Sequence, residues 1–223
     1  MKRNQSGFTL IEIAIVLVII GLLLGGVMKG QELINSAKVK NLAADFKNTS
    51  LYIYSYQDKF RALPGDDAQA ASHVSTATTA GGSGTTLGNG RIDGFWDDYA
   101  AASNTVESFL FWQHVRLAGI ATGITSTSDL VGYSPRNTLG GLIGITNTTA
   151  TNLPITGLTG AYIICSGNIQ GKFAKQLDIM MDDGATSTGS MRTSAAVPGA
   201  KSINQAVVPD PIDADLYTVC MGV

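Results

Sequence analysis

The stretch GFTLIEIAIVLVIIGLLLGGVM, residues 7–28, decides the architecture of this chain. Residues 8–28 form an almost unbroken apolar run, and at about 1.5 Å per residue a helix of that length crosses the roughly 30 Å hydrocarbon core of a bilayer. A secretory signal would have a shorter apolar core followed by a small-residue cleavage site. The run is therefore expected to stay in the membrane as the first half of a long helix.

One carboxylate, that of Glu12, interrupts the apolar run close to its start. An ionised side chain inside a spanning helix costs roughly 2.5–3.5 kcal/mol on insertion scales, so such a residue is a functional hypothesis by default. Glu12 is either a harmless acid near one end of a membrane anchor or a carboxylate that meets a cationic partner in an assembled state. The residues around it favour the second interpretation.

A short leader with Lys2 and Arg3 precedes the pair Gly7-Phe8. Because positively charged flanks stay in the cytoplasm, the leader is expected there and the remainder of the chain across the membrane. Together with Glu12 and the apolar run, this leader resembles the class III signal of type IV pilins and type II secretion pseudopilins.

The resemblance implies how the chain is processed and assembled. A membrane-embedded prepilin peptidase would cut after Gly7, and the same enzyme would methylate the new N-terminal amine of Phe8. Glu12 would then neutralise that amine on a neighbouring subunit. The expected partners are this peptidase/N-methyltransferase, other pilin or pseudopilin subunits and an inner-membrane assembly platform, with membrane lipid around the helix before assembly.

The implied function is that of a structural subunit of a type IV pilus or type II secretion filament, and the length of 223 residues favours a minor pilin or pseudopilin. The subunit would sit in the bacterial inner membrane as a single-pass protein with a periplasmic head, and later in a periplasmic or cell-surface filament. The alternative is a membrane-anchored periplasmic adhesion or ligand-binding protein that does not polymerise. The net charge of −2 gives no sign of a nucleic-acid partner.

An enzyme is not expected. The two histidines, His73 and His114, have no metal-ligand spacing to another histidine or to a cysteine. Neither a G-x-S-x-G elbow nor a phosphate-binding glycine loop occurs in the sequence. His114 is expected to be a helix-packing residue.

An amphipathic half of the same helix is expected over residues 29–62, ended by Leu63-Pro64-Gly65. Spacings of three and four predict a face that packs on a sheet, made of Val39, Leu42, Phe46, Thr49, Ile53, Tyr56 and Phe60. The predicted organisation is thus a cleaved leader (1–7), a transmembrane half-helix (8–28), an amphipathic half-helix (29–62) and a globular periplasmic head (63–223).

The head is predicted to hold a small antiparallel sheet, so the fold class is α+β and pilin-like, with a disulfide-closed C-terminal region. Residues 107–119 have a helical pattern, whereas strands are expected at residues 139–145, 160–165 and 217–220. Residues 173–181 fit a helix or a strand, and the alternation of Leu177, Ile179 and Met181 slightly favours a strand. Residues 195–208 are expected to be irregular.

Cys165 and Cys220 are the only cysteines of the chain. In a head that follows an export segment, such a pair indicates a disulfide formed in an oxidising compartment. The loop that it would close is worth roughly 4 kcal/mol on the chain-entropy estimate. The alternative is two unpaired buried thiols, although no other cysteine competes for either partner.

Two acidic stretches raise the question of calcium. The first combines Asn89 with Asp93, Asp97 and Asp98, and in the second Asp178, Asp182 and Asp183 precede Gly184. Calcium takes about six to eight oxygen ligands from flexible loops, but neither stretch has the EF-hand spacing with its terminal glutamate. Solvated turns are the simpler explanation. No metal or other cofactor is therefore expected, with calcium at these aspartates as the alternative.

Overall fold

A computed structural model describes residues 9–81, 86–98, 105–128, 130–149, 151–196 and 203–223. The helices are α1 Leu10–Phe60, α2 Ala70–His73, α3 Glu107–Leu117, α4 Leu130–Tyr133 and α5 Gly171–Met181, and the strands are β1 Ile143–Thr146, β2 Ile163–Gln170, β3 Met191–Ala195 and β4 Leu216–Gly222. The contacts divide the chain into two units, Met1–Lys38 and Val39–Val223. Helix α1 contributes to both units.

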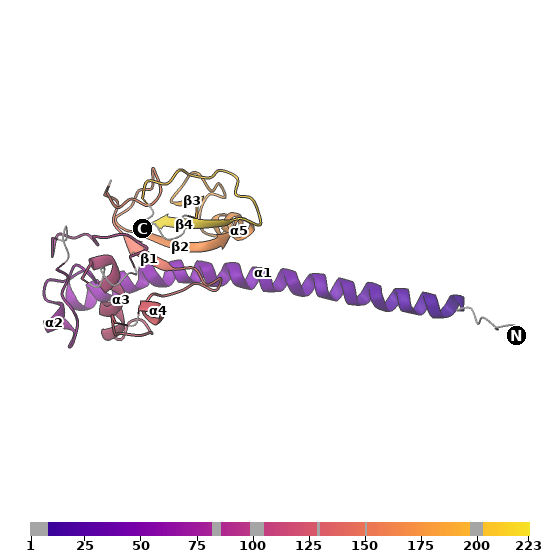
Figure 1. Cartoon of the computed structure of the whole chain (residues 1–223), viewed down its shortest axis with the longest axis horizontal. Helices are drawn as coiled ribbons and strands as arrows, with labels where there is room; N and C mark the ends of the chain where they lie inside the picture. The colour runs from indigo at the N-terminus through magenta and orange to yellow at the C-terminus, as the bar shows by residue number, and fades with distance from the viewer. Residues whose placement is uncertain (1–8, 82–85, 99–104, 129, 150, 197–202) are drawn as a thin grey trace, which may run out of the picture. The chain divides into compact units, whose positions relative to one another are not determined.

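In the unit Val39–Val223, the final part of α1 packs on the sheet by the predicted face (Figure 1). Six of the seven predicted residues are buried, and Phe60 is half-buried: the buried ones are Val39, Leu42, Phe46, Thr49, Ile53 and Tyr56. All of these except Thr49 share one hydrophobic core with residues of α3, α5 and the strands. The prediction of an amphipathic half-helix docked on a sheet is therefore confirmed.

Helix α1 ends where the sequence predicts a stop. Arg61 takes a left-handed conformation with φ of 55°, and Gly65 follows with φ of 93°. A Cβ atom at Gly65 would collide with the carbonyl oxygen of Glu107, at the start of α3. Glycine is thus required there both by its backbone angle and by the close approach of another chain segment.

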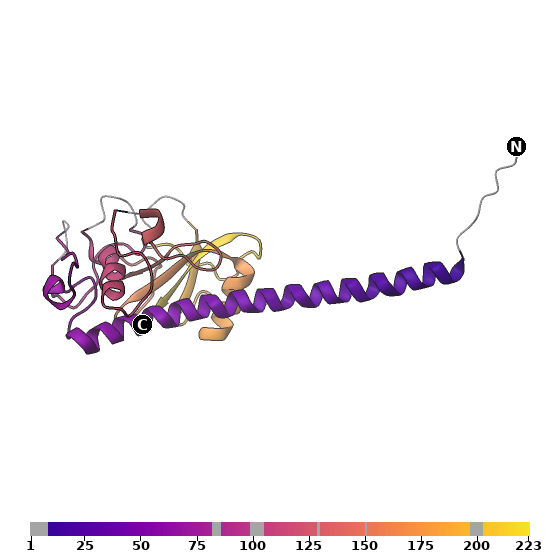
Figure 2. The ribbon, with the colours of Figure 1, turned by 90° about the horizontal axis from the view of Figure 1, so that it is seen from below.

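The four strands form one antiparallel sheet in the order β1-β2-β4-β3. Strands β2 and β4 are central, and Cys165 lies directly opposite Cys220 in their register. Helix α5 packs against β2, β3 and β4 at the end of the sheet away from α2 and α3 (Figure 2). This sheet confirms the α+β, pilin-like class and holds the two cysteines in its centre.

The preference for a strand over residues 173–181 was wrong, because these residues belong to α5. Phe173, Ala174 and Leu177 are buried at helical spacings, whereas Ile179 is 69% exposed. The alternation of apolar residues therefore does not mark alternate faces of a strand. It marks a helix whose apolar residues extend beyond its buried face.

The other predicted strands are present, but their bounds differ from those expected. The strand expected at 139–145 is β1, Ile143–Thr146, and that expected at 160–165 is β2, Ile163–Gln170. Strand β4 contains the predicted residues 217–220 and extends on both sides. Strand β3 was not predicted, and its last residue lies in the segment expected to be irregular, of which residues 197–202 are outside the described residues.

Candidate functional site

The start of α1 holds a capping box formed by Thr9 and Glu12. Glu12 Oε2 accepts hydrogen bonds from the Thr9 backbone N–H at 2.8 Å and from Thr9 Oγ1 at 2.7 Å. The Glu12 N–H donates to Thr9 Oγ1 at 3.3 Å. The two residues thus satisfy each other's polar groups at a helix end that begins at Leu10. Gly7 and Phe8, the predicted processing residues, lie outside the described residues.

The capping box gives Glu12 a role that the sequence interpretation missed. Its signal was present, because a threonine followed three residues later by a glutamate is the capping-box pattern. A carboxylate in this arrangement is held at the tip of the helix rather than left without partners. Oε1 of Glu12, in contrast to Oε2, accepts no hydrogen bond from the described residues.

The described side chains of residues 9–28 are all exposed within their unit. Helix α1 is long and apolar enough to cross a membrane, as judged by length and composition alone. So many exposed apolar side chains need a nonaqueous surrounding, because the transfer of apolar surface out of water lowers the free energy.

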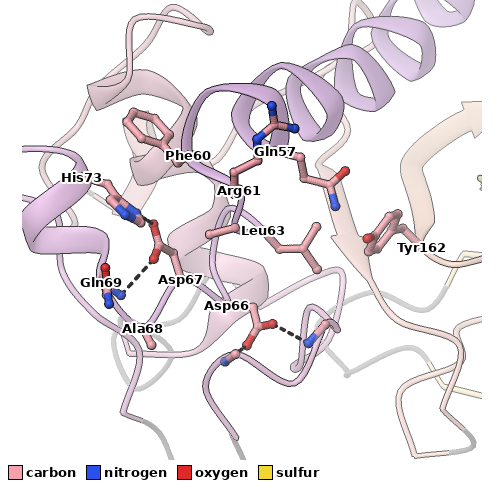
Figure 3. Close-up of a pocket in the computed structure, with 13 residues that line it drawn as sticks. Gln57, Phe60, Arg61, Leu63, Asp66, Asp67, Ala68, Gln69, His73 and Tyr162 are labelled. Atoms are coloured by element: carbon pink, nitrogen blue, oxygen red, sulfur yellow. Dashed lines mark hydrogen bonds and ion pairs between the residues drawn. The ribbon is translucent and has the colours of Figure 1, made fainter.

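A cavity of about 710 Å³ lies beside the end of α1 in the second unit, with Asp66, Asp67 and His73 in its wall (Figure 3). Asp67 Oδ2 accepts from the Tyr56 hydroxyl at 2.8 Å and lies 2.7 Å from His73 Nδ1. Asp67 Oδ1 accepts from the Gln69 N–H at 2.8 Å. None of the described residues that line the cavity is a serine, threonine or cysteine. Through its bonds to Tyr56 and His73, Asp67 connects the turn before α2 both to α1 and to α2.

Asp66, the neighbouring acid, is buried and holds a second loop. Its carboxylate accepts from the backbone N–H groups of Gly88, Asn89 and Gly90. Burial raises the pKa of Asp66, and the surrounding N–H groups oppose that rise. Both carboxylates of this cavity thus act as anchors for loop backbone.

His114 is fully buried in α3 and bonded through both ring nitrogens. Nδ1 accepts from the Gly65 N–H at 2.9 Å, so Nε2 carries the proton that is donated to the Thr78 carbonyl oxygen at 2.8 Å. Burial lowers the pKa of His114, which keeps the ring neutral. The expected packing role of His114 is what the structure shows.

Glu107, at the first position of α3, is a buried acid that sequence reasoning missed. Oε2 accepts from the Asp93 N–H at 2.7 Å, whereas Oε1 has no hydrogen-bond partner among the described residues. Burial, aided by the charges of Asp66 and Asp93, raises the pKa of Glu107 to about 7, although the hydrogen bond from the Asp93 N–H opposes the rise. No local sequence pattern marks this acid, because its burial depends on the tertiary packing of α3.

We expect Glu107→Gln to stabilise the protein at pH 8 by roughly 2–3 kcal/mol, since one pKa unit corresponds to about 1.4 kcal/mol. Between the ordinary pKa of 4.5 and the folded value of about 7, the folded chain retains a proton that the unfolded chain has lost. Stability of the wild type therefore falls as the pH rises through this window, and the amide removes that contribution. Chemical denaturation at pH 5 and pH 8 measures the free energy of unfolding of the wild type and the variant, with the exposed Asp58→Asn as control. A variant as pH-sensitive as the wild type would contradict the assignment.

The first acidic stretch is not gathered into a metal-ligand cluster. Asp93 accepts from Asn147 Nδ2 at 2.6 Å and from Asn89 Nδ2 at 3.1 Å, and Asp98 accepts from the Phe95 N–H at 2.7 Å. These bonds bind the loop to itself and to the end of β1. Among the described residues, Asp93, Asp97 and Asp98 are not grouped as ligands for a common ion.

The second acidic stretch is brought together. Asp178, Asp182 and Asp183 each present a carboxylate oxygen within 4.8 Å of the others. Burial raises the pKa of Asp178 to about 6, although the backbone N–H groups of Gly184 and Ala185 lower it somewhat. The aspartates lie where α5 ends and the connection to β3 begins.

The predicted disulfide is confirmed. Cys165 and Cys220 are joined, with their Cα atoms 4.1 Å apart on the central strands β2 and β4. Both cysteines are fully buried, beside Trp96, Ile155 and Leu158. The alternative of two unpaired thiols is therefore wrong.

Comparison with protein families finds the prokaryotic N-terminal methylation motif over residues 2–28. Comparisons with curated proteins and with solved structures find no match. The motif is a class III prepilin signal, and with the apolar helix it indicates anchoring in the inner membrane before assembly. The methylation motif is typical of type IV pilins and pseudopilins, and the fold of the described residues is a pilin-like α+β fold.

Proposed function

We propose that this chain is a structural subunit, a minor pilin or pseudopilin, of a type IV pilus or type II secretion filament. Residues 1–7 are its leader, removed by a prepilin peptidase between Gly7 and Phe8. Residues 8–28 anchor the subunit in the inner membrane, and residues 29–62 connect the anchor to a periplasmic head formed by residues 63–223. In the filament, the apolar half of α1 exchanges lipid for the same helix of neighbouring subunits.

The observation that carries this proposal is the combination of the motif with a solitary acid on an exposed apolar helix. Residues 10–28 contain one charged side chain, that of Glu12, at the third position of α1. In a simple anchor the carboxylate would serve only the capping box with Thr9, at the cost of placing a charge in lipid. A filament subunit gains a partner for it, because removal of the leader creates a cationic amine at Phe8, four residues away in the sequence.

The capping box is compatible with this pairing. Thr9 occupies Oε2 of Glu12 through two hydrogen bonds. A carboxylate has about four lone-pair sites, so Oε1 is left to accept from the amine of an adjoining subunit. Thr9 would then orient the carboxylate, and the charge of Glu12 would provide the attraction.

We expect the mature protein to begin at an N-methylated Phe8, and Gly7→Val to block that processing. Glycine at the cleaved bond lets the peptidase approach the backbone closely, which a branched side chain would prevent. Mass spectrometry of the N-terminal peptide from membranes measures both outcomes, with Ser6→Ala as a matched change in the leader. A wild-type chain that keeps residues 1–7 would refute the proposed function.

A further inference from the structure

A second cavity, of about 130 Å³, is lined by residues of α1, α3 and the segment that leads into β1. A water molecule occupies about 30 Å³, so this cavity has room for about four waters or for an organic molecule of about six non-hydrogen atoms. Its wall contains three charged residues, Asp45 of α1, Arg116 of α3 and Arg136, which lies between α4 and β1. All three belong to the unit Val39–Val223.

Arg116 is a buried cation without a counter-ion. The residue is 8% exposed, and no acidic group forms an ion pair with it within 4.0 Å in the described part of the chain. Nη1 donates to the carbonyl oxygens of Ile124 at 2.8 Å and Tyr133 at 2.6 Å, whereas Nε is buried with no hydrogen-bond partner among the described residues. Buried charges are normally paired, so this guanidinium lacks an anion.

Asp45 is an unpaired acid in the wall of the same cavity. Its side chain is half-buried, and it joins no ion pair among the residues that the structure describes. The Thr49 hydroxyl donates to the backbone carbonyl oxygen of Asp45 at 2.8 Å rather than to its carboxylate. Burial raises the pKa of Asp45 to about 6, as expected for a carboxylate without a cationic neighbour. Asp45 and Arg116 thus line one cavity without neutralising each other.

The helical period places further polar groups of α1 beside Asp45. Asn48, Thr49 and Tyr52 follow it by three, four and seven positions, so the four residues lie on one side of the helix, and all of them line the cavity. The ring of Tyr52 meets that of Trp112 edge to face, with the centroids 6.5 Å apart. Aromatic walls with a few polar groups between them are typical of small-molecule sites.

Arg136 adds a second cation at the exposed edge of the cavity. Its side chain is exposed, and Nη1 donates to the carbonyl oxygen of Gly140 at 2.9 Å. A guanidinium has five N–H donors, so Arg136 keeps others for a ligand. A simple anion in this cavity would leave Asp45 unpaired, and a simple cation would leave Arg116 unpaired. A ligand that carries both charges pairs with all three residues.

We propose that this cavity binds a small zwitterion of the α-amino acid class, of the size of glycine or alanine. The carboxylate of the ligand pairs with Arg116 and Arg136, because the planar fork of a guanidinium fits a carboxylate. The ammonium group of the ligand pairs with Asp45. This inference concerns the head alone, and it does not depend on whether the chain polymerises.

Isothermal titration calorimetry of the full chain in detergent with L-alanine tests the site, at about pH 8, where Asp45 is ionised. We expect a dissociation constant below about 1 mM, which a ligand of about six non-hydrogen atoms can reach. The fluorescence of Trp112 should change on binding, because Trp112 lines the cavity, whereas Trp96 lies beside the disulfide. Acetate and methylammonium each carry only one of the two charges and should bind at least about tenfold more weakly.

Two results with the wild type would overturn the proposal. The first is no heat and no change in fluorescence with either glycine or L-alanine at up to about 20 mM. The second is acetate that binds as tightly as L-alanine, because the cavity would then be a plain anion site in which Asp45 has no role.

Two variants assign the charges without disturbing the core. Asp45→Asn should weaken L-alanine binding at least about tenfold and should bind acetate no more weakly than the wild type does, whereas Arg136→Gln should weaken both ligands. Arg116 is left in place, because its Nη1 holds two backbone carbonyl groups. Asp58→Asn changes an exposed acid of the same helix outside the cavity and should bind L-alanine as the wild type does. Equal affinity for L-alanine in all three variants would disprove the site.

Discussion

Glu12→Ala is expected to leave the chain in the membrane and to remove it from filaments. Loss of the carboxylate lowers the cost of inserting the apolar helix, so membrane insertion should be unchanged or improved. Incorporation into filaments should fall by at least about 100-fold, because an ion pair about 4 Å apart is worth several kcal/mol at an effective dielectric constant near 20. Membrane fractionation measures insertion, and immunoblots of sheared filaments measure incorporation.

Two further variants separate the charge of Glu12 from its role in the capping box. In the wild type, the Thr9 N–H donates to Glu12 Oε2 at 2.8 Å. Glu12→Gln keeps an oxygen that can accept this hydrogen bond but carries no charge. If the charge is what matters, Glu12→Gln fails as severely as Glu12→Ala. If the cap alone matters, Glu12→Gln assembles almost normally, and the charge-pairing mechanism is wrong.

Glu32→Ala is the matched control on the same helix. Glu32 is also an exposed glutamate, and it pairs with Lys29 at 2.6 Å. An ion pair of this kind contributes little, so its loss should not affect incorporation strongly. An equal defect in Glu32→Ala would show that assembly responds to any loss of acid from α1, which would remove the special position of Glu12.

The long helix and its docking face were predictable because their signals are local. The apolar run of residues 8–28 and the spacing from Val39 to Tyr56 both repeat with the helical period, and the Pro64-Gly65 pair marks the end. The disulfide was predictable for a different reason, since two cysteines in an exported head allow only one internal pairing. Neither inference needed knowledge of the sheet.

The assignment of α5 could not be made safely from local pattern. Leu177, Ile179 and Met181 alternate as in a strand, but only Leu177 of the three is buried. The tertiary position of α5 against β2, β3 and β4 decides which apolar residues face the core. Strand β3 was missed for the same reason, because the partner strand of Met191–Ala195 is β4, which lies beyond the segment expected to be irregular.

The residues of the candidate sites were also visible in the sequence, whereas the burial of their side chains was not. The acidic residues Asp178, Asp182 and Asp183 were visible in the sequence as a cluster, because they lie within six positions of one another. The burial of Asp178 was not visible, and it is the feature that distinguishes this cluster from a solvated turn. Likewise, the burial of Glu107 depends on the loop of Asp93, which reaches it only in the fold.

Replacing both cysteines, as Cys165→Ala with Cys220→Ala, is expected to destabilise the head by about 4 kcal/mol. The bond closes a loop with a sequence separation of 55, and the chain-entropy estimate for such a loop is about 4 kcal/mol at 25 °C. For a domain of this size, the Tm should fall by about 10 °C. Thermal unfolding of the full chain in detergent, under non-reducing conditions, measures the change.

The contribution of the bond itself can be separated from that of the buried sulfur atoms. Reduced wild-type protein keeps both sulfur atoms in the core between β2 and β4, whereas the double alanine variant loses their volume. If the link between the strands provides the stability, reduction of the wild type should lower its Tm by most of the decrease seen in the double variant. If the reduced protein melts within about 2 °C of the oxidised protein, the sheet pairing of Cys165 with Cys220 is sufficient alone, and the link adds nothing to the fold.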